Sequence, residues 1–166
     1  MNDEVILVNE TDEFVGTMDK LEAHQKGLLH RAFSIFIFND AGQLLLQRRA
    51  NGKYHSAGLW ANTCCSHPRP EESTMDAAKR RLKEEMGIET DLEKKFDFIY
   101  RAQLDNGLIE YEFDHVFTGQ YNGNPVPDIN EVSEYRWVSI PTLKSEIEQY
   151  PEKYSEWLKI AIDSFR

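Results

Sequence analysis

The segment NTCCSHPRPEES, residues 62–73, contains the strongest local signals in the chain, and a helical pattern follows it directly. Two adjacent cysteines come before Ser-His-Pro, and Ser73 stands at the start of the helical pattern. Serine is a preferred helix N-cap, and Asp76, three positions later, forms a variant of the capping box. Gly87 ends the pattern because glycine readily adopts the positive φ of a helix C-cap. The segment therefore predicts a loop that carries cysteine and histidine side chains into a capped helix, whose apolar stripe is Met75, Ala78, Leu82 and Met86.

Other parts of the chain have the pattern of β-strands, because they alternate or run apolar and are rich in aromatic and β-branched residues. These strands are predicted over residues 4–9, 13–19, 31–39, 42–49, 96–104, 107–119 and 131–140. Asp40-Ala41-Gly42 and Asp105-Asn106-Gly107 are typical of hairpin turns. Further helices are predicted over residues 142–149 and from Pro151 through Ile162. Strands mixed with helices in this way predict an α/β or α+β layered domain.

The composition is that of a globular protein: 166 residues, of which 40% are hydrophobic and 29% charged. No apolar run approaches the roughly 20 residues that cross a bilayer, and the acidic N-terminus lacks the positive charge of a secretory signal. A net charge of −10 disfavours nucleic acid and anionic membranes, although a local basic patch can overrule the average field. We therefore expect a cytoplasmic protein with no nucleic-acid or membrane partner.

Cys64 and Cys65 are the only cysteines in the sequence. A disulfide between neighbours closes a strained ring, so reduced thiols in a cytoplasm are expected. Three interpretations remain open on this pattern alone: core residues, a redox pair, or a reactive thiol beside a metal ligand.

His24 and His30 are six residues apart, with Gly27 between them. On a continuous helix they would point about 120° apart, so they share a ligand only if the chain bends. Gly27 permits that bend because it can take positive φ. The simpler alternative is a pair of polar residues near a loop, and His67 in Ser-His-Pro is equally ambiguous.

The stretch GLIEYEFDHVF places three acidic residues on one face of a strand: Glu110, Glu112 and Asp114. A half-exposed strand with an acidic, solvated face is the simplest interpretation. Neighbouring carboxylates repel one another, however, unless a cation or a shared proton intervenes. Three imidazoles and two of these carboxylates would form a site of nitrogen and oxygen ligands suited to Mn²⁺, Zn²⁺ or Mg²⁺.

The predicted helix carries two pairs of opposite charge at i,i+4 spacing, Arg80–Glu84 and Arg81–Glu85. A solvated salt-bridged face is the default explanation, although the basic residue comes first in both pairs, which is the less favourable order. Alternatively, Arg81 and Glu85 face a site together, one holding a phosphate and the other a cation. Other cations that would add to such a pocket are Lys20, Arg48, Arg49 and Lys53. A strongly anionic ligand would be drawn to this spot against the global field.

Four motifs combine in this chain: HRAFSIFIFN (30–39), GLWANTCCSHP (58–68), Glu85-Met86-Gly87 and Glu110-Tyr111-Glu112. Together they resemble the type I isopentenyl-diphosphate isomerases, Nudix-fold enzymes that interconvert isopentenyl and dimethylallyl diphosphate. The resemblance extends from Lys20 to Trp157. It implies a single catalytic domain over residues 1–166, in which a mixed Nudix-like β-sheet is layered between helices.

The Nudix hydrolase box, G-x₅-E-x₇-R-E-U-x-E-E-x-G with U apolar, is degenerate in this chain. Its positions from the first glycine to the last glutamate fall at Ser66, Glu72, Arg80, Arg81, Leu82, Glu84 and Glu85. Arg81 thus replaces an acid, which removes a metal ligand and adds a phosphate-binding fork. The change suits an enzyme that holds a diphosphate without cleaving it.

The resemblance implies roles position by position. The implied ligands of a first metal, which is Mn²⁺, Zn²⁺ or Mg²⁺, are His24, His30, His67, Glu110 and Glu112. A second ion, Mg²⁺ bridging the diphosphate, is implied at Glu85. The implied diphosphate contacts are Lys20, Arg49, Lys53 and Arg81. The implied catalytic residues are Cys65 and Glu112, with Tyr100 and Trp157 around the reacting carbons.

Two departures from the family pattern accompany these roles. Ser66 stands where glycine is frequent, and the spacing between the first two histidines varies. His55 and His115 match no family ligand and are interpreted as structural or surface residues.

The implied reaction adds a proton to one end of a double bond and removes a proton from a neighbouring carbon, by way of a tertiary carbocation. It requires a closed apolar cavity, in which Trp157 would stabilise the cation. The alternatives are a Nudix diphosphate hydrolase, which Arg81 disfavours, a non-catalytic diphosphate-binding module, and a cysteine–histidine hydrolase. The expected partner is a small diphosphate, and the expected state is a monomer or weak homodimer.

Overall fold

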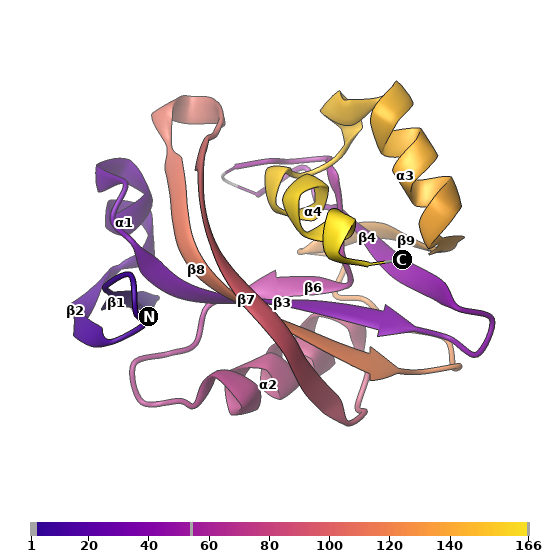
Figure 1. Ribbon diagram of the computed structural model, residues 1–166, viewed down its shortest axis with the longest axis horizontal. Coiled ribbons are helices and arrows are strands. Elements are labelled where there is room, and N and C mark those ends of the chain that lie inside the picture. Colours follow the sequence, from indigo (N-terminus) through magenta and orange to yellow (C-terminus); the bar gives the residue numbers. More distant parts are fainter. Residues whose placement is uncertain (1–2, 54, 166) are drawn as a thin grey trace.

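Strand β3 (His30–Phe38) is the centre of the sheet, because it pairs with four other strands. The structure is a computed structural model that describes residues 3–53 and 55–165 (Figure 1). Along one edge β3 runs parallel to β8 (Ile109–Gln120) over its whole length. Its other edge is shared in turn by β1 (Glu4–Val8), β6 (Cys64–Ser66) and β4 (Gln43–Arg49), all antiparallel. The predicted mixed sheet is therefore confirmed.

The remaining strands extend the sheet outward from this centre. They are β2 (Phe14–Asp19), β5 (Trp60–Ala61), β7 (Leu92–Gln103) and β9 (Val132–Ser139). The helices are α1 (Lys20–Lys26), α2 (Thr74–Met86), α3 (Ile140–Gln149) and α4 (Glu156–Ala161). All the predicted strands are present with shifted ends, and β7 begins at Leu92 rather than Phe96. The sequence patterns missed α1, β5 and β6, which are short.

Helix α2 has the predicted caps at both ends. The Ser73 Oγ accepts a hydrogen bond from the Asp76 N–H at 3.1 Å, and Gly87 has a φ of 65°. A Cβ at Gly87 would lie 2.8 Å from the Val126 carbonyl oxygen, so glycine is required there by both conformation and space. These caps set the point at which the chain leaves the loop of residues 62–73 and enters the helix.

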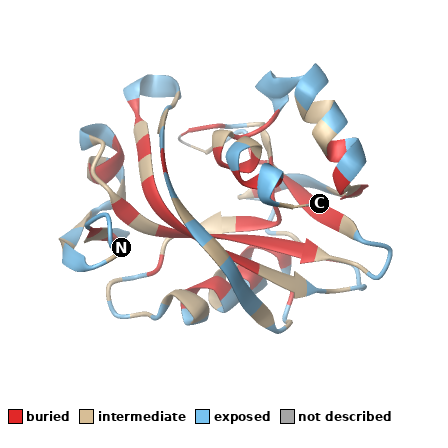
Figure 2. Ribbon diagram, viewed as in Figure 1, coloured by how far each residue is buried: buried red, intermediate tan, exposed pale blue. Residues whose placement is uncertain are grey.

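Two apolar layers hold the sheet between helices, and β3 is buried along nearly its whole length (Figure 2). On one face Ile35 packs with Leu82 and Met86 of α2, and on the other Phe36 packs with Leu158 of α4. Alternate residues of β3 thus belong to opposite layers, as the pleat of a strand requires. Figure 1 shows α2 on one side of the sheet and α3 and α4 on the other, so the predicted layering is confirmed.

The C-terminal segment differs from the prediction of one helix from Pro151 through Ile162. Pro151 instead opens a 3₁₀ turn, and α4 begins later, with Ser155 as its N-cap. Between them Tyr154 is extended and buried, and the Ser155 N–H donates to the Trp60 carbonyl at 2.9 Å. Tertiary packing against β5 therefore overrides the helical pattern. None of the described helices is long and apolar enough to cross a bilayer.

Candidate active site

Gly27 turns the chain so that two histidines six residues apart meet. It ends α1 with a φ of 67°, which returns the backbone toward β3. His24, on α1, and His30, the first residue of β3, are both fully buried, with ring centroids 5.0 Å apart. The bend that the sequence suggested is therefore present.

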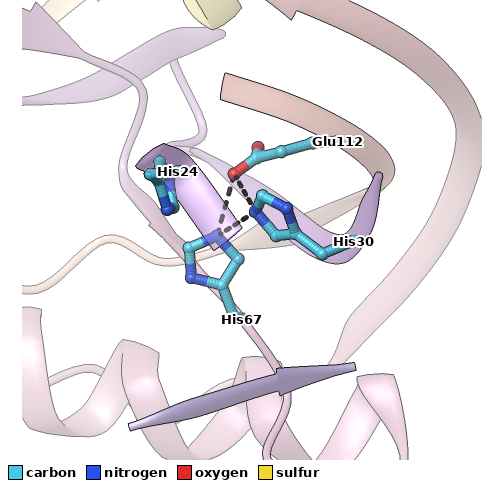
Figure 3. Close-up of side chains that lie close together, drawn as sticks. All are labelled: His24, His30, His67 and Glu112. Carbon is cyan, nitrogen blue, oxygen red and sulfur yellow. Dashed lines mark hydrogen bonds and ion pairs between the residues drawn. The ribbon is translucent and has the colours of Figure 1, made fainter. Parts of the chain in front are cut away.

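Strand pairing brings acidic residues to these imidazoles. In the parallel register His30 is opposite Glu112 of β8, and the His30 Nε2 lies 3.3 Å from the Glu112 Oε2. The His67 Nε2 lies 2.8 Å from the same oxygen (Figure 3). His67 follows directly after β6, which pairs with β3 on the opposite edge from β8. Three separate segments thus meet across the start of β3.

The predicted metal ligands fall into two overlapping groups that share His24. One ligand atom from each of His24, His30, His67 and Glu112 lies within 4.8 Å of the others. The same holds for a second group made by His24, His55 and Glu110. Below, the histidine group means the five predicted ligands among these residues: His24, His30, His67, Glu110 and Glu112. His55 is described separately.

The acidic face of β8 is buried, so the interpretation as a solvated face is wrong. Glu110, Glu112 and Asp114 are 3%, 5% and 1% exposed. The face is covered by α1, by the loop before β5 and by β7, whose Tyr100 lies opposite Glu112. Buried carboxylates at this spacing require compensation by protons or cations.

A shared proton supplies part of that compensation. The Tyr100 hydroxyl forms hydrogen bonds with both Glu110 and Glu112, the latter at 2.8 Å. A hydroxyl has only one proton to donate, so one of these carboxyls must donate a proton of its own. Burial and the neighbouring Glu112 charge raise the pKa of Glu110. The pKa of Glu112 is lowered against the effect of burial, because His30 and His67 bond to it. Burial therefore favours the protonated form of Glu110, whereas the imidazole partners of Glu112 favour its ionised form.

Two of the imidazoles, His55 and His67, have the protonation state of potential metal ligands. Burial lowers the pKa of His67 to about 4, and burial with the nearby Arg49 charge lowers the pKa of His55 to about 2. Both are neutral at pH 7 and offer a lone pair. Burial opposes charge on His24 too, but the bond to Glu110 raises its pKa. A dication would compete with that proton. Buried imidazole and carboxylate donors that converge in this way fit a divalent ion.

Cys65 differs from Cys64 in its surroundings. Cys64 is fully buried in the layer against α2, with its Sγ 3.6 Å from the Glu85 Oε2. Cys65 is half-buried at the cavity, and its thiol donates to the Asn62 Oδ1 at 2.9 Å. Burial raises the pKa of the Cys65 thiol well above its usual value, which keeps it protonated. The Trp157 Nε1–H donates to the same Asn62 oxygen at 3.1 Å. Asn62 thus links the thiol and the indole.

Four cations line the same cavity, and we call them the basic group: Lys20, Arg49, Lys53 and Arg81. The Arg81 Nη2 lies 2.8 Å from the Glu85 Oε2 and 2.7 Å from the Glu131 Oε2, and the Lys53 Nζ lies 3.6 Å from Glu131. Although burial opposes it, the Glu85 carboxylate helps to raise the pKa of Arg81, which stays charged. Arg81 and Glu85 therefore face the cavity together, as the alternative interpretation of α2 expected.

One cavity is lined by most of the predicted site residues. Those at its wall are Lys20, Arg49, Lys53, Cys65, His67, Arg81, Glu85, Glu110, Glu112 and Trp157. His24, His30 and Tyr100 are outside this lining and are buried. Arg49 lies over the Trp157 ring, with its Cζ 5.2 Å from the ring centroid. The lining also holds His55 and Glu131, which the sequence interpretation had not assigned to the site.

His55 was interpreted as a structural or a surface residue; it is 5% exposed, so the second alternative is wrong. His115 is also buried, and its Nε2 lies 2.9 Å from the Asp12 Oδ2, outside the histidine group. Asn62 was missed as well, although it lies in the segment that opens the sequence analysis. No local pattern identifies these residues, because most of their contacts come from segments distant in sequence.

The chain resembles known proteins in sequence and in fold. The NUDIX domain pattern matches residues 28–158. Isopentenyl-diphosphate Delta-isomerase 1 of Aromatoleum aromaticum is 56% identical over 98% of this chain and 92% of that protein. Isopentenyl-diphosphate Delta-isomerase of Burkholderia multivorans is 48% identical over 98% of this chain and 93% of that protein. The crystal structure of DR0079 from Deinococcus radiodurans has a TM-score of 0.82 at 19% identity, covering 99% of this chain and 100% of that one, which is a likeness of fold alone.

Proposed function

This chain belongs to the Nudix-fold family of isopentenyl-diphosphate Delta-isomerases, and we propose that it converts isopentenyl diphosphate into dimethylallyl diphosphate by two proton transfers. A proton added to the terminal alkene carbon leaves a tertiary carbocation. Loss of a proton from the neighbouring carbon then forms the new double bond. The single observation that carries this proposal is one cavity whose wall holds the Cys65 thiol and the Glu112 carboxylate together with the basic group.

A divalent ion held by the histidine group is part of the proposal. The ligand atoms of His24, His30, His67 and Glu112 converge within 4.8 Å, and burial keeps His67 neutral. A bound dication would neutralise the buried carboxylates and set the orientation of Glu112. Among ions that accept this ligand set, Mn²⁺ and Zn²⁺ suit the nitrogen donors better than Mg²⁺.

The basic group would hold the diphosphate. Arg81 and Lys53 now bond to Glu85 and Glu131. A diphosphate offers these cations stronger acceptors than the carboxylates do. Glu85, released from Arg81, would then hold the Mg²⁺ that accompanies the diphosphate. Tight binding of the diphosphate at one end positions the hydrocarbon at the other.

Cys65 and Glu112 are the proposed proton-transfer groups. They come from β6 and β8, the strands on opposite edges of β3, so they reach the cavity from two directions. The Cys65 thiol is protonated, and Glu112 is the ionised member of the carboxylate pair. Arg49 lies over the Trp157 ring, so the face of the indole already attracts a cation. This contact supports a role for Trp157 in stabilising the positive charge of the carbocation. The cavity wall is mostly polar and charged, so protection of the carbocation requires that the bound substrate itself exclude water.

The proposal is tested by NMR of the metal-loaded protein with isopentenyl diphosphate and Mg²⁺ in D₂O. We expect dimethylallyl diphosphate with deuterium at carbon, because the added proton comes from an exchangeable group. Release of inorganic phosphate with the double bond unmoved would instead identify a diphosphate hydrolase. No product from a metal-loaded preparation would favour a binding module.

The neighbouring cysteines offer a matched pair of variants for the role of Cys65. Cys65→Ser keeps the size of the side chain but weakens the acid, so we expect kcat to fall at least about a hundredfold with metal content unchanged. Cys64→Ala alters the adjacent buried thiol and should retain turnover. Retained turnover in Cys65→Ser would remove Cys65 from its proposed role.

A further inference from the structure

We propose that His55 is a sixth protein ligand of the ion held by the histidine group, beside His24 and Glu110. The inference rests on the metal site proposed above and adds a residue that neither the resemblance nor the sequence pattern assigns. His55 is 5% exposed and lines the cavity. Its Nε2 lies 3.8 Å from the Glu110 Oε2, the same distance as the His24 Nε2.

Within the group of His24, His55 and Glu110, these distances suit ligands of a single ion. Two ligand atoms about 2.1 Å from one metal lie about 3.0 Å apart when adjacent and about 4.2 Å apart when opposite. The 3.8 Å separations fall between these limits. The distances between ring centroids agree with this. The centroid of the His24 ring lies 5.0 Å from that of His30, 5.8 Å from that of His67 and 5.5 Å from that of His55. His55 is therefore no further from His24 than an accepted ligand is.

The orientation of the His55 ring matches that of the other histidines. In ligating histidines the second ring nitrogen is normally held by a polar group, so that the first points at the metal. The His24 Nδ1 lies 2.8 Å from the Lys20 carbonyl oxygen, and the His30 Nδ1 lies 2.9 Å from the Leu28 carbonyl oxygen. The His55 Nδ1 lies 3.1 Å from the Ser56 Oγ, which leaves its Nε2 toward Glu110.

The loop around His55 is held in an unfavourable conformation. Ser56 has a φ of 53°, which is uncommon for any residue other than glycine. Its N–H donates to the Asp105 Oδ1 at 3.1 Å, and the Arg49 Nη2 donates to the His55 carbonyl at 3.2 Å. Backbone strain of this kind persists where the surroundings impose it, and it concentrates at binding sites. Here it fixes the position of the His55 imidazole.

A fourth imidazole changes which ion the site prefers. The full set would be four imidazole nitrogens and two carboxylate oxygens, with no ligand position left for water. Mg²⁺ favours oxygen ligands and retains bound water, so it is disfavoured, whereas Zn²⁺ and Mn²⁺ accept imidazole.

The direct test counts imidazoles bound to Mn²⁺. The intact protein, with ¹⁵N-labelled histidine, is chelated and reloaded with Mn²⁺, and directly bound nitrogens are counted by pulsed electron–nuclear double resonance. We expect four bound imidazoles and one ion per chain. Three bound imidazoles would overturn the role of His55 but leave the proposed metal site intact. Two ions per chain would overturn the single-ion arrangement, and no tight binding would contradict the proposed metal site itself.

Variants give an independent measurement. His55→Ala should weaken Mn²⁺ affinity at least about tenfold, measured by competition with a chelator, and should reduce the count to three imidazoles. His115→Ala removes another buried histidine that bonds to Asp12, and it should leave affinity unchanged. Unchanged affinity in His55→Ala would overturn the proposal. Because the imidazole count is made on the unmodified protein, the test does not depend on the variant folding.

Discussion

Two pairs of carboxylates border the same cavity, and they differ in what balances their charge. Glu110 and Glu112 face imidazoles and the Tyr100 hydroxyl. Glu85 and Glu131 face permanent cations, and Arg81 bonds to both. Among the described residues, the first pair bonds to groups that can lose or share protons, whereas the second pair bonds to the Arg81 guanidinium, which stays charged.

Because of this difference, the first pair suits a metal ion and the surroundings of the second pair suit an anionic ligand. A buried carboxylate pair whose partners are imidazoles and a hydroxyl has no permanent positive charge bonded to it, and a dication would supply that charge. A carboxylate pair that bonds to Arg81 and Lys53 instead keeps cations in position until a stronger anion arrives. The net charge of −10 does not indicate either carboxylate pair, because the charge balance of each pair depends on a few neighbouring residues.

The largest effect is expected for Glu112→Gln, which removes the Glu112 charge from the carboxylate pair beside the imidazoles. The amide has nearly the same shape but cannot accept a proton or balance a dication. We expect kcat to fall at least about a thousandfold together with loss of metal affinity, measured by NMR assay and metal analysis. Glu131→Gln makes the same chemical change in the other pair and should retain the metal. Equal metal loss in both variants would abolish the distinction between the pairs.

Arg81→Ala should weaken diphosphate binding beside the other pair, Glu85 and Glu131. Loss of charge-assisted hydrogen bonds to a diphosphate weakens its binding by about 1.5–3 kcal/mol, so we expect KM to rise roughly tenfold to a hundredfold. Mn²⁺ affinity at the histidine group should stay unchanged. Arg80→Ala is the matched control, because Arg80 bonds to Glu72 and Glu84. An equal rise of KM in Arg80→Ala would show that diphosphate binding depends on nearby positive charge in general and not on the contacts of Arg81.

Removal of the ion should destabilise the fold at the histidine group. Binding at a hundred times Kd stabilises a protein by about 2.7 kcal/mol, which corresponds to about 5–10 °C in Tm for a chain of this size. Calorimetric scans with and without a chelator measure this shift. In His30→Ala the shift should nearly disappear, whereas in Arg81→Ala it should persist. A chelator effect that His30→Ala leaves intact would place the ion elsewhere.

The smallest effect is the pH dependence of the chelated protein. His67 has a pKa of about 4 in the folded protein, below its ordinary value of 6.5. Between these values the unfolded chain binds more protons than the folded one, so stability should fall as pH decreases from about 6.5 toward 4. Urea unfolding across this range measures the slope, and His67→Gln should reduce it. An unchanged slope in that variant would assign the effect to other groups.

Much of the fold was predictable because its signals are local. Ser73 and Gly87 mark the ends of α2 by the hydrogen bonds and the φ that their own residue types favour. The nearly continuous apolar run of β3 likewise marks a strand buried on both faces. The C-terminal segment was predicted less well, since Tyr154 leaves the helical pattern to pack against β5.

The site was predictable only as far as residue types and motif spacing carry it. Cys65, His67, Glu110 and Glu112 were identified as candidates from motifs, and each adjoins the cavity. His55 was not assigned to the site, because its neighbours His24 and Glu110 come from elements distant in sequence.

The sequence by itself determined the capped helix, the main strands and the family to which the chain belongs, because each rests on residue identity and short-range spacing. Only the tertiary structure decided that the acidic face of β8 is buried and that Asn62 joins Cys65 to Trp157. It alone brought His55 to the other imidazoles. The physical reason is that burial and charge balance depend on strand register across β3, and no local pattern encodes which distant side chains that register brings together.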